Sequence, residues 1–372
     1  MGVINPDPLL RDVYCILGLP IDVIEMPAVF CRIDAAIANA TPFLISTANV
    51  NFLVLSQFDR DFAESLLLSD VCTADGMPIV WIARLLGIPL KHRVAGSDMF
   101  EALKSEQRLS RPLKLFLFGG ADGAAATAAS ALNETPDRVV QCVGWISPGF
   151  GTIDEMSTDD IIEKINASAA DFLVVSLGAR KGHLWLQRNH HQIRIPVRTH
   201  LGAVMNFEAG AVRRAPQSLR KYGLEWLWRI KEEPYLWRRY WRDGRVLIQL
   251  LSTRVLPLAV MALYQRLRFP AQALEIRHRL DGQSATLALS GFATEPRVPQ
   301  AIAAFRSALT GSKNVVIELT DTLFIDCRFF GLLLMLRKQL EGSGRSLSFS
   351  GISPRLARLF RLNGVDFLLP SS

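Results

Sequence analysis

Short apolar runs alternate with helix-like segments over the first two thirds of the chain, and this alternation constrains the fold more than any other feature. The strand-like runs cover 43–46, 113–118, 171–177 and 197–203, and helical patterns cover 59–69, 78–87, 123–132 and 158–168. Continuous apolar strands that alternate with helices are typical of a parallel sheet covered on both faces. We therefore predict an α/β fold for this part of the chain.

Ligands of such sheets bind beyond the carboxyl ends of the strands. The stretch T-A-N at 47–49 follows the first predicted strand. Thr47 and Asn49 could hydrogen-bond a sugar or a phosphate there, and either could equally cap the next helix. Both interpretations stay open from these residues alone.

A glycine-rich stretch, L-F-L-F-G-G-A-D-G-A-A at 115–125, follows the second predicted strand. Gly119, Gly120 and Gly123 would let the backbone approach a diphosphate at the N-terminus of the next helix. The stretch lacks the full G-x-G-x-x-G spacing. A tight turn without a ligand explains the glycines equally well.

An isolated carboxylate lies in V-C-T-A-D-G-M-P-I at 71–79. At the mouth of the sheet, Asp75 could take a proton from an attacking hydroxyl group, although it could equally cap the helix that begins near 78. Arg93, in H-R-V-A-G-S-D at 92–98, could hold phosphate because its guanidinium is planar and permanently charged. Asp98 is either a helix cap or the partner of Arg93.

Nearly all of the net charge of +7 lies in one segment. Residues 213–245 contain ten bases and four acids, so ten minus four gives +6. Such a segment suits an anionic partner, either a lipid or diphosphate or a nucleic acid. The interleaved tryptophans resemble a nucleic-acid stacking surface, but Trp237 and Trp241 are four residues apart and fit an amphipathic helix. Nucleic acid is therefore the weaker expectation.

Cysteine and histidine usage indicates a reduced, cytoplasmic protein without a metal site. The five cysteines are widely spaced and include no C-x-x-C, and His190 and His191 are adjacent, so they cannot share a helix face. No secretory signal is expected at the N-terminus. We expect no cofactor and no metal.

The segment after 245 is strongly apolar but interrupted by polar residues. Its longest stretch without charges or amides, Val255–Tyr264, has ten residues and contains Pro257. A spanning helix needs about twenty, so we do not expect this segment to cross a bilayer. An interfacial amphipathic segment and a core helix are both consistent with the pattern.

A second α/β unit of normal domain size begins near 273. The pattern predicts a hairpin from 274–280 and 285–289, with the turn dipeptide Asp281-Gly282. Helices at 299–309, 330–340 and 354–362 and strands at 314–319 and 347–350 follow. The predicted domains are thus 1–245 and 273–372, with a linker at 246–272.

Several blocks of the first domain resemble, in order, the WecG/TagA/CpsF family, glycosyltransferase family 26. Among them are I-S-T-A-N-V-N, T-A-D-G-M-P-I-V, H-R-V-A-G-S-D, L-F-G-G-A-D-G, R-R-A-P and G-L-E-W-L-W-R. The resemblance covers roughly 13–243 and implies a Rossmann-like fold. It also implies an inverting transferase that moves a sugar from a UDP-sugar to a polyprenyl-diphosphate-linked acceptor in surface polysaccharide (exopolysaccharide) synthesis.

The resemblance also implies residue roles. The family's proposed base falls on Asp75, its T-A-N pair on Thr47 and Asn49, and its R-V-A-G-S-D arginine on Arg93. The family's basic C-terminal appendage, which is thought to cover the active site and meet the membrane, corresponds to 213–245 and begins with Arg213 and Arg214. These features imply a protein bound peripherally to the inner face of the cytoplasmic membrane, with an anionic membrane surface as a partner.

One block departs from the family pattern. Many members have G-x-P-K-Q-E-x-W after the third predicted strand, whereas this chain has G-A-R-K-G-H-L-W at 178–185. Gly182 and His183 replace the glutamine and the glutamate, so a substrate contact of that glutamine is lost or moved. We expect Arg180 or Lys181 to contact phosphate instead.

The C-terminal unit resembles a STAS domain of the anti-sigma-factor-antagonist type, on N-V-V-I-E-L-T-D-T-L-F-I-D at 314–326 and the leucine-rich helix after it. Regulatory members continue with a phosphorylatable serine, but here Asp326 is followed by Cys327 and Arg328. We therefore expect a docking module for a protein or ligand without a phosphoserine switch, or an add-on that only stabilises the chain. The altered block at 178–185 favours an alternative function, in which a degenerate transferase is a membrane scaffold that acts through the STAS unit, whereas the intact Thr47, Asn49, Asp75 and Arg93 oppose it.

Overall fold

The computed structural model describes residues 7–135, 138–221, 223–269, 273–281, 284–311 and 314–369. These residues form two compact units. The first comprises 24–79 and 92–245, and the second comprises 7–23, 80–91 and 246–369. The expected division into contiguous domains therefore differs from the structure, because two segments of the first 91 residues group with the C-terminal part.

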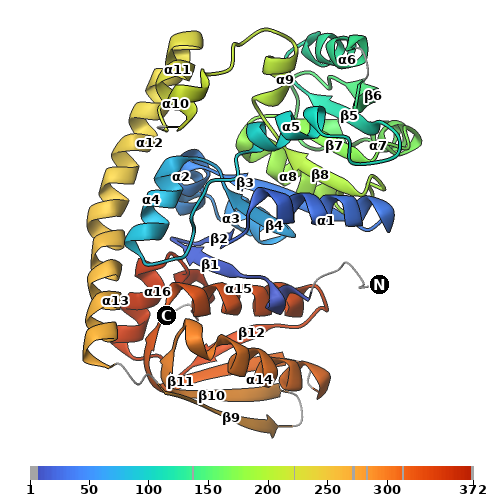
Figure 1. The fold of residues 1–372 in the computed structure, drawn as a ribbon. Coiled ribbons are helices and arrows are strands. Elements are labelled where there is room, and N and C mark those ends of the chain that lie inside the picture. The colour runs from blue at the N-terminus through green and yellow to red at the C-terminus, as the bar shows by residue number, and fades with distance from the viewer. Residues whose placement is uncertain are drawn as a thin grey trace. The chain divides into compact units, whose positions relative to one another are not determined.

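A six-stranded parallel sheet forms the centre of the first unit (Figure 1). Its order is β4-β3-β8-β7-β5-β6, and each neighbouring pair is parallel. The strands are β3 (Phe43–Ala48), β4 (Val71–Ala74), β5 (Leu113–Gly119), β6 (Val140–Ile146), β7 (Phe172–Ser176) and β8 (Val197–His200).

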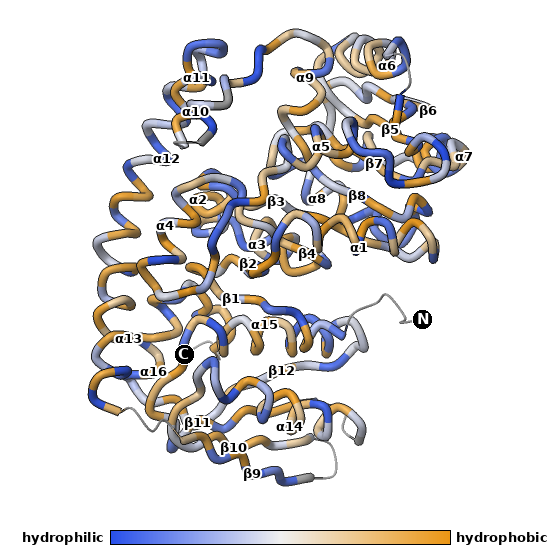
Figure 2. Tube along the Cα trace, in the orientation of Figure 1, coloured by the Kyte–Doolittle hydropathy of each residue, from blue (hydrophilic) through white to orange (hydrophobic). Residues whose placement is uncertain are grey.

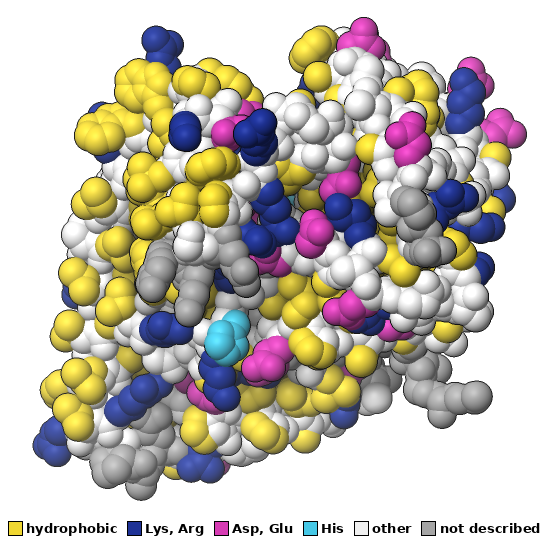
Figure 3. Space-filling view, turned by 45° about the horizontal axis from the view of Figure 1, so that its top comes forward, with side chains coloured by type: hydrophobic (Ala, Val, Ile, Leu, Met, Phe, Trp, Pro, Cys, Tyr) yellow, Lys and Arg dark blue, Asp and Glu magenta, His cyan; other side chains and the backbone are white. Residues whose placement is uncertain are grey.

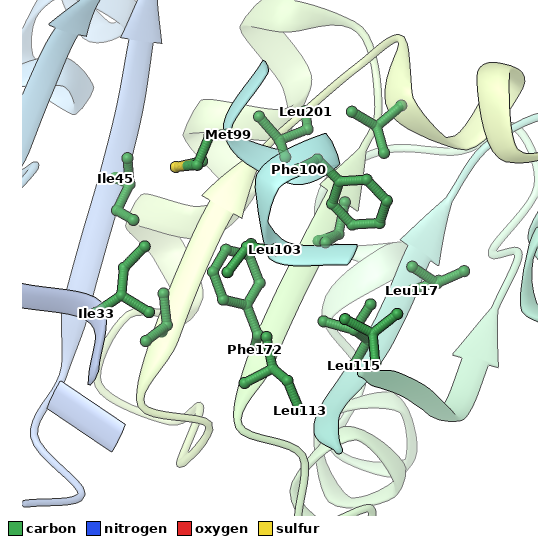
Figure 4. Close-up of a cluster of buried hydrophobic side chains, with 14 of the residues drawn as sticks. Ile33, Ile45, Met99, Phe100, Leu103, Leu113, Leu115, Leu117, Phe172 and Leu201 are labelled. Carbon is green, nitrogen blue, oxygen red and sulfur yellow. The ribbon is translucent and has the colours of Figure 1, made fainter. Parts of the chain in front are cut away.

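Helices alternate with these strands, as the sequence predicts. They are α1 (Met26–Ala38), α2 (Val50–Phe58), α3 (Arg60–Leu67), α4 (Met77–Leu85), α5 (Gly96–Ser105), α6 (Ala124–Glu134), α7 (Asp159–Ala167), α8 (Ala179–Asn189), α9 (Val204–Glu208), α10 (Gln217–Lys221) and α11 (Glu225–Glu232). Alternate strand side chains point to opposite faces. Accordingly, α1, α5, α6 and α9 share one core cluster with the sheet, drawn in part in Figure 4, and α7 and α8 share the other.

The predicted fold class is confirmed, including all four predicted strands. The fourth is shorter than expected, because β8 ends at His200 rather than 203. Two strands of this sheet, β4 and β6, were not predicted. β4 is a four-residue strand that contains Thr73, and β6 includes Gly144 and an exposed Trp145, so the apolar pattern of both is interrupted.

The second unit contains a mixed four-stranded sheet of order β12-β11-β10-β9. Its strands are β9 (Leu274–Asp281), β10 (Ser284–Ala293), β11 (Asn314–Ile325) and β12 (Leu347–Ser350), and its helices are α14 (Val298–Gly311), α15 (Cys327–Glu341) and α16 (Pro354–Leu362). Strands β9 and β10 pair antiparallel, with Asp281 opposite Ser284. The predicted hairpin is therefore confirmed, although its turn residue Gly282 lies outside the described residues.

An N-terminal hairpin packs on this sheet domain. Strands β1 (Val13–Ile16) and β2 (Leu19–Asp22) pair antiparallel, and β1 lies against α15. Arg328 of α15 donates to the carbonyl oxygens of Val13 and Arg11, both at 3.2 Å, and its Nε lies 2.9 Å from the Asp12 carboxylate. The residue that follows the expected switch position is thus bound by the chain's own N-terminal segment.

The switch position itself, Cys327, is half-buried. Asp326 caps α15 by accepting from the Phe329 N–H at 2.8 Å, and it also accepts from the Glu295 N–H at 2.7 Å. The Cys327 thiol lies 3.5 Å from the side-chain oxygen of Asn363, and burial raises its pKa well above the usual value for a thiol. These residues hold the start of α15 in place.

The predicted linker is largely helical. Helix α12 (Trp237–Leu250) continues through a π-helical turn, η4 (Leu251–Val255), into α13 (Leu256–Arg268). The continuous helix Pro234–Arg268 has 35 residues and is long and apolar enough to cross a membrane by length and composition. We expected this segment not to cross a bilayer because polar residues and Pro257 interrupt it. Length and composition alone do not distinguish a spanning helix from an interfacial helix or a core helix.

The hairpin–α15 contact gives a test of the fold. A Cβ at Gly331 would lie 2.0 Å from the Val13 carbonyl oxygen, which is backbone and cannot move aside. We expect Gly331→Ala to lower the free energy of unfolding by about 1–3 kcal/mol, as overpacking does, measured by chemical denaturation. The matched control is Gly244→Ala in α12, where a Cβ has open space. It should be neutral or stabilise by up to about 1 kcal/mol, and a similar gain at Gly331 would contradict the described packing.

Candidate active site

Asp75 directly follows β4 at the carboxyl edge of the parallel sheet. Its backbone N–H donates to the Ala48 carbonyl oxygen at 2.8 Å, which ties it to the end of β3. Gly76 then takes a left-handed φ of 115°, which turns the chain into α4. The half-buried side chain is therefore at the edge where ligands of parallel sheets bind.

The N-terminus of α5 faces the Asp75 carboxylate. The Gly96 N–H donates to Asp75 Oδ2 at 3.4 Å, and the N-cap residue of the helix, Ala95, has no side chain that could cap it. A Cβ at Gly96 would lie 2.4 Å from Leu201 and 3.0 Å from the hydroxyl oxygen of Thr47. Glycine is thus required where α5, β3 and the end of β8 converge, and Thr47 and Asp75 lie on either side of the same residue.

Asn49 has the capping role that the sequence left open. Its side-chain oxygen accepts from the Phe52 N–H at 3.2 Å, as the N-cap of α2. Its position after β3 agrees with the prediction, but this oxygen is already engaged in a local hydrogen bond.

Arg93 is fully paired with carboxylates. Its two terminal nitrogens lie 3.2 Å from Asp98 and 3.2 Å from Glu225. Asp98 was expected to be either a helix cap or the partner of Arg93, and the structure shows that it pairs with Arg93. Its carboxylate also accepts from Arg220 at 3.2 Å and from Arg214.

The basic appendage thus reaches the candidate site. Arg214, Arg220 and Glu225 come from the segment around α10 and α11, more than a hundred residues after Arg93. Arg214 also donates to the Ser97 hydroxyl at 3.2 Å. Arg213 differs from its neighbour, because its backbone groups bond to Glu232 and Trp228 within the appendage. Of the two predicted arginines, the structure brings Arg214 to Asp98.

The surroundings of Asp75 raise its pKa to about 7. Burial is the main cause, because it penalises the charged form. The negative charge of Glu225 raises the pKa further and that of Asp98 adds to this, whereas Arg93 and the Gly96 N–H lower it. The carboxylate is thus balanced between its protonated and ionised forms near neutral pH.

The glycine-rich stretch lies at the same edge of the sheet but not next to Asp75. Strand β5 is four positions from β4, about 19 Å at about 4.8 Å per strand. Gly119 and Gly120 have φ of 107° and 82°, and a Cβ would lie 2.6 Å from the Ser176 carbonyl oxygen and 2.4 Å from Met205, respectively. These two glycines are required by the turn itself.

Gly123 is different. It precedes α6 with a φ of 76°, and a Cβ there would meet nothing within 4 Å. The backbone at the N-terminus of this eleven-residue helix is therefore open. Of the three glycines, this position best fits the prediction of a backbone that can approach a phosphate.

Arg180 and Lys181 have partners elsewhere. Arg180 forms an ion pair with Asp59, the N-cap of α3, and Lys181 donates to the Gly151 carbonyl oxygen at 2.7 Å. Neither partner belongs to the group around Asp75 and Arg93. The structure therefore does not bring these two predicted phosphate ligands to the candidate base.

The departure from the family pattern has a packing explanation. A Cβ at Gly182 would lie 2.2 Å from the ring of His200, so the glycine makes room for this ring. His183 is buried against Phe52 and Phe62 at ring-centroid distances of 4.9 and 5.6 Å. Burial lowers the pKa of both histidines, which keeps them neutral. Gly182 and His183 are thus part of the core.

Sequence reasoning missed Glu225 and Arg220 as members of the site. Both were counted only as charges of the basic segment. The signal was their position in or near the family block G-L-E-W-L-W-R, but the pairing with Arg93 and Asp98 depends on the folded path of the appendage. Over the described residues, no group of three or more His, Cys, Asp or Glu side chains is arranged to hold a metal.

Comparisons with known proteins show which families this chain resembles. The family model "Glycosyl transferase WecG/TagA/CpsF family" matches residues 14–258, and the model "Mlab, STAS domain" matches residues 276–370. A relative from Bacillus spizizenii is named N-acetylglucosaminyldiphosphoundecaprenol N-acetyl-beta-D-mannosaminyltransferase. It is 29% identical over 204 residues, which cover 54% of this chain and 75% of the relative. A relative of the same name from Staphylococcus aureus is 24% identical over 229 residues, covering 61% and 86%.

Two solved structures are similar to the C-terminal part. The unphosphorylated anti-sigma factor antagonist SpoIIAA is 18% identical, with 27% of this chain and 88% of that chain covered and a TM-score of 0.24. A STAS domain from Rhodobacter sphaeroides is 21% identical, with 22% and 88% covered and a TM-score of 0.19. With the match over 14–258, the chain belongs to the WecG/TagA/CpsF glycosyltransferase family, and it carries a C-terminal STAS domain.

Proposed function

We propose that this protein transfers a sugar, of the N-acetylhexosamine or hexose type, from a UDP-sugar to a polyprenyl-diphosphate-linked acceptor in surface polysaccharide synthesis. The observation that carries the proposal is one carboxylate, Asp75, held at the carboxyl edge of the sheet beside paired arginines. The names of the two relatives, which specify an N-acetylmannosaminyl group and a diphosphoundecaprenol acceptor, support this class of reaction.

In the proposed reaction, Asp75 accepts the proton of the acceptor hydroxyl group. The hydroxyl oxygen forms a bond to the anomeric carbon of the donor, and the bond between that carbon and the UDP oxygen breaks. Attack opposite to the leaving group inverts the configuration. A base whose pKa is about 7 is well matched to proton transfer near neutral pH.

The arginines around Asp98 are the candidates for the diphosphate charge that grows as UDP leaves. The Nε atoms of Arg214 and Arg220 are buried and have no hydrogen-bond partner among the described residues. Buried donors are normally satisfied, and phosphate oxygens would satisfy them with charge-assisted bonds. In the proposed complex, oxygen atoms of the diphosphate accept some of the arginine hydrogen bonds that the Asp98 carboxylate accepts in this structure.

We place the protein on the inner face of the cytoplasmic membrane, where its lipid-linked acceptor would lie. The net charge of +6 over 213–245 supports this location, because each base near an anionic surface contributes about 1 kcal/mol of binding. The scaffold alternative is weaker. Its main support was the altered block at 178–185, and Gly182 and His183 are explained by packing around His200.

The first prediction concerns the base. Asp75→Asn keeps the shape of the side chain but cannot accept the proton, so we expect turnover to fall by about 10²–10⁴-fold. The measurement is lipid-linked product formed from a panel of UDP-sugars with membrane acceptors, identified by mass. Asp160→Asn, an exposed acid on α7, is the matched control, and equal activity of Asp75→Asn and wild type would remove the assignment.

The same substitution has a stability readout that does not need substrate. The folded-state pKa of Asp75, about 7, lies above the ordinary value of 3.8 for an aspartate, so the folded state binds a proton that the unfolded state has released. The contribution of this protonated carboxyl group to the free energy of unfolding is therefore fully present below pH 3.8 and is lost as the pH rises through about 7. Relative to wild type, Asp75→Asn should be more stable above pH 7 than below pH 5, as measured by denaturation. A difference that does not change with pH would contradict the raised pKa.

The pH profile tests the role of Glu225. Because the base must be ionised, kcat/KM should rise with pH through about 7. Glu225 raises the pKa of Asp75, so Glu225→Gln should move this rise to lower pH. Glu232→Gln, on the same helix, should leave the midpoint unchanged. Identical midpoints in wild type and Glu225→Gln would show that this charge does not act on the base.

We also propose that turnover needs no bound metal, with arginines neutralising the diphosphate. Activity should then persist in EDTA with metal-free substrates, measured by the same product assay. Loss of activity in EDTA that added magnesium restores would overturn this part of the proposal and leave the assignment of Asp75 untouched.

A further inference from the structure

The second unit has an apolar helix face that no described residue covers. On α13, Leu256, Val260, Leu263 and Leu267 are exposed, Val260 by 66% and Leu267 by 75%. Their spacing of four, three and four residues places them on one side of the helix. The opposite side is buried at Leu258 and Gln265. Figure 2 shows α13 as largely hydrophobic.

Helix α16 presents a row of bases. Leu356, Leu359 and Phe360 point into the core of the second unit, where the Phe360 ring lies 4.9 Å from that of Phe330. Arg355, Arg358 and Arg361 are spaced three residues apart and are exposed. This helix contains no acidic residue. The three guanidinium groups therefore form a cationic row on its outer side.

The apolar face and the basic row meet in a groove. It has a volume of about 640 Å³ and is lined by Leu256, Pro257, Val260, Met261, Arg355 and Arg358, with Ser252 at its end. A smaller hollow of about 350 Å³ adjoins it, lined in part by Arg254, Arg358 and Arg361. An apolar wall opposite arginines is the combination that a lipid with an anionic headgroup requires.

The two chain segments around the groove contain basic residues and no acidic residues. Residues 246–269 contain three arginines and no acid, and residues 351–365 contain three arginines and no acid. Figure 3 shows hydrophobic side chains along the left margin of the view, over the long helix, with basic side chains among them at the lower left. A protein partner that covered such a surface would have to be both acidic and apolar, whereas an anionic membrane supplies both properties at once.

We propose that the groove between α13 and α16 binds the phosphate headgroups of anionic glycerophospholipids, so that the STAS-containing unit has its own membrane contact. Arg355, Arg358 and Arg361 bind the phosphates, for which guanidinium groups are suited by geometry. The exposed row of α13 enters the acyl region, as the apolar face of an interfacial helix does. This site is separate from the basic segment 213–245 and does not depend on the transferase reaction.

A spanning arrangement of the same helix fits the structure less well. Arg254 would then lie deep in the hydrocarbon, which is costly. Val255 and Leu258 are also buried within the second unit, so this side of the helix is already occupied by protein. A helix lying in the interface keeps these contacts and leaves its exposed row for the lipid.

The test measures binding of the full-length protein to vesicles by flotation. Phosphatidylcholine vesicles are compared with phosphatidylcholine vesicles that contain phosphatidylglycerol, at low and high salt. The triple variant Arg355→Gln, Arg358→Gln, Arg361→Gln should bind the anionic vesicles about 100-fold more weakly than wild type, at about fivefold per base. The matched control, Arg138→Gln, Arg194→Gln, Arg279→Gln, removes the same charge at exposed positions outside the groove and should bind nearly as wild type does.

A second variant examines the apolar face. Val260→Gln with Leu267→Gln should also weaken binding, because both side chains are exposed and their replacement does not disturb the core. Thermal unfolding checks that all variants are folded. Asp75→Asn should bind vesicles as wild type does, so failure of the reaction and failure of the lipid site are distinguishable. Equal binding by the α16 triple variant and its control would overturn the proposal. Salt-independent binding to neutral vesicles would overturn it equally.

Discussion

One carboxylate, that of Asp98, bonds to three arginines and thereby holds the candidate site together. It accepts from Arg93 on the loop before α5, and from Arg214 and Arg220 in the appendage. Through these ion pairs the appendage is fastened to the carboxyl edge of the sheet. Glu225 then meets Arg93, and the negative charge of Glu225 is part of what raises the pKa of Asp75. The pKa of Asp75, the proposed base, therefore depends on a segment that lies far from it in the sequence.

The same ion pairs make the site responsive to an anion. A diphosphate offers the guanidinium groups more oxygen atoms and more charge than a single carboxylate does. A ligand bound by Arg214 and Arg220 would lie beside the ion pair of Arg93 with Glu225 and would therefore change the balance of charges around Asp75. Under the proposed function, binding of the diphosphate leaving group and the proton affinity of Asp75 are linked through Asp98 and Arg93.

Features of the site could be predicted from the sequence where the interacting residues are close together in the chain, and could not be predicted where they are far apart. Thr47, Asp75 and Gly123 were found because a strand end is a local feature, and all strands of a parallel sheet end at one edge. The pairing of Arg93 with Asp98 was among the expected alternatives because only five residues separate the two, and the structure confirms it. The partners of Arg180 and Lys181, Asp59 and the Gly151 carbonyl, could not be predicted because they leave no local pattern in the sequence. Glu225 could not be found, since 132 residues separate it from Arg93 and only the folded path joins them.

The N-terminal hairpin illustrates the same limit and has a consequence for how the chain is made. Arg328 and the carbonyl of Val13 are 315 residues apart. At about 5–20 residues per second, synthesis separates the emergence of these two elements by about 15–60 s. During this interval the first parallel sheet can form, while the hairpin has no surface on which to pack. The second unit is thus completed only after α15 has left the ribosome, so that a chain ended before α15 exposes the apolar surface of the β1–β2 hairpin.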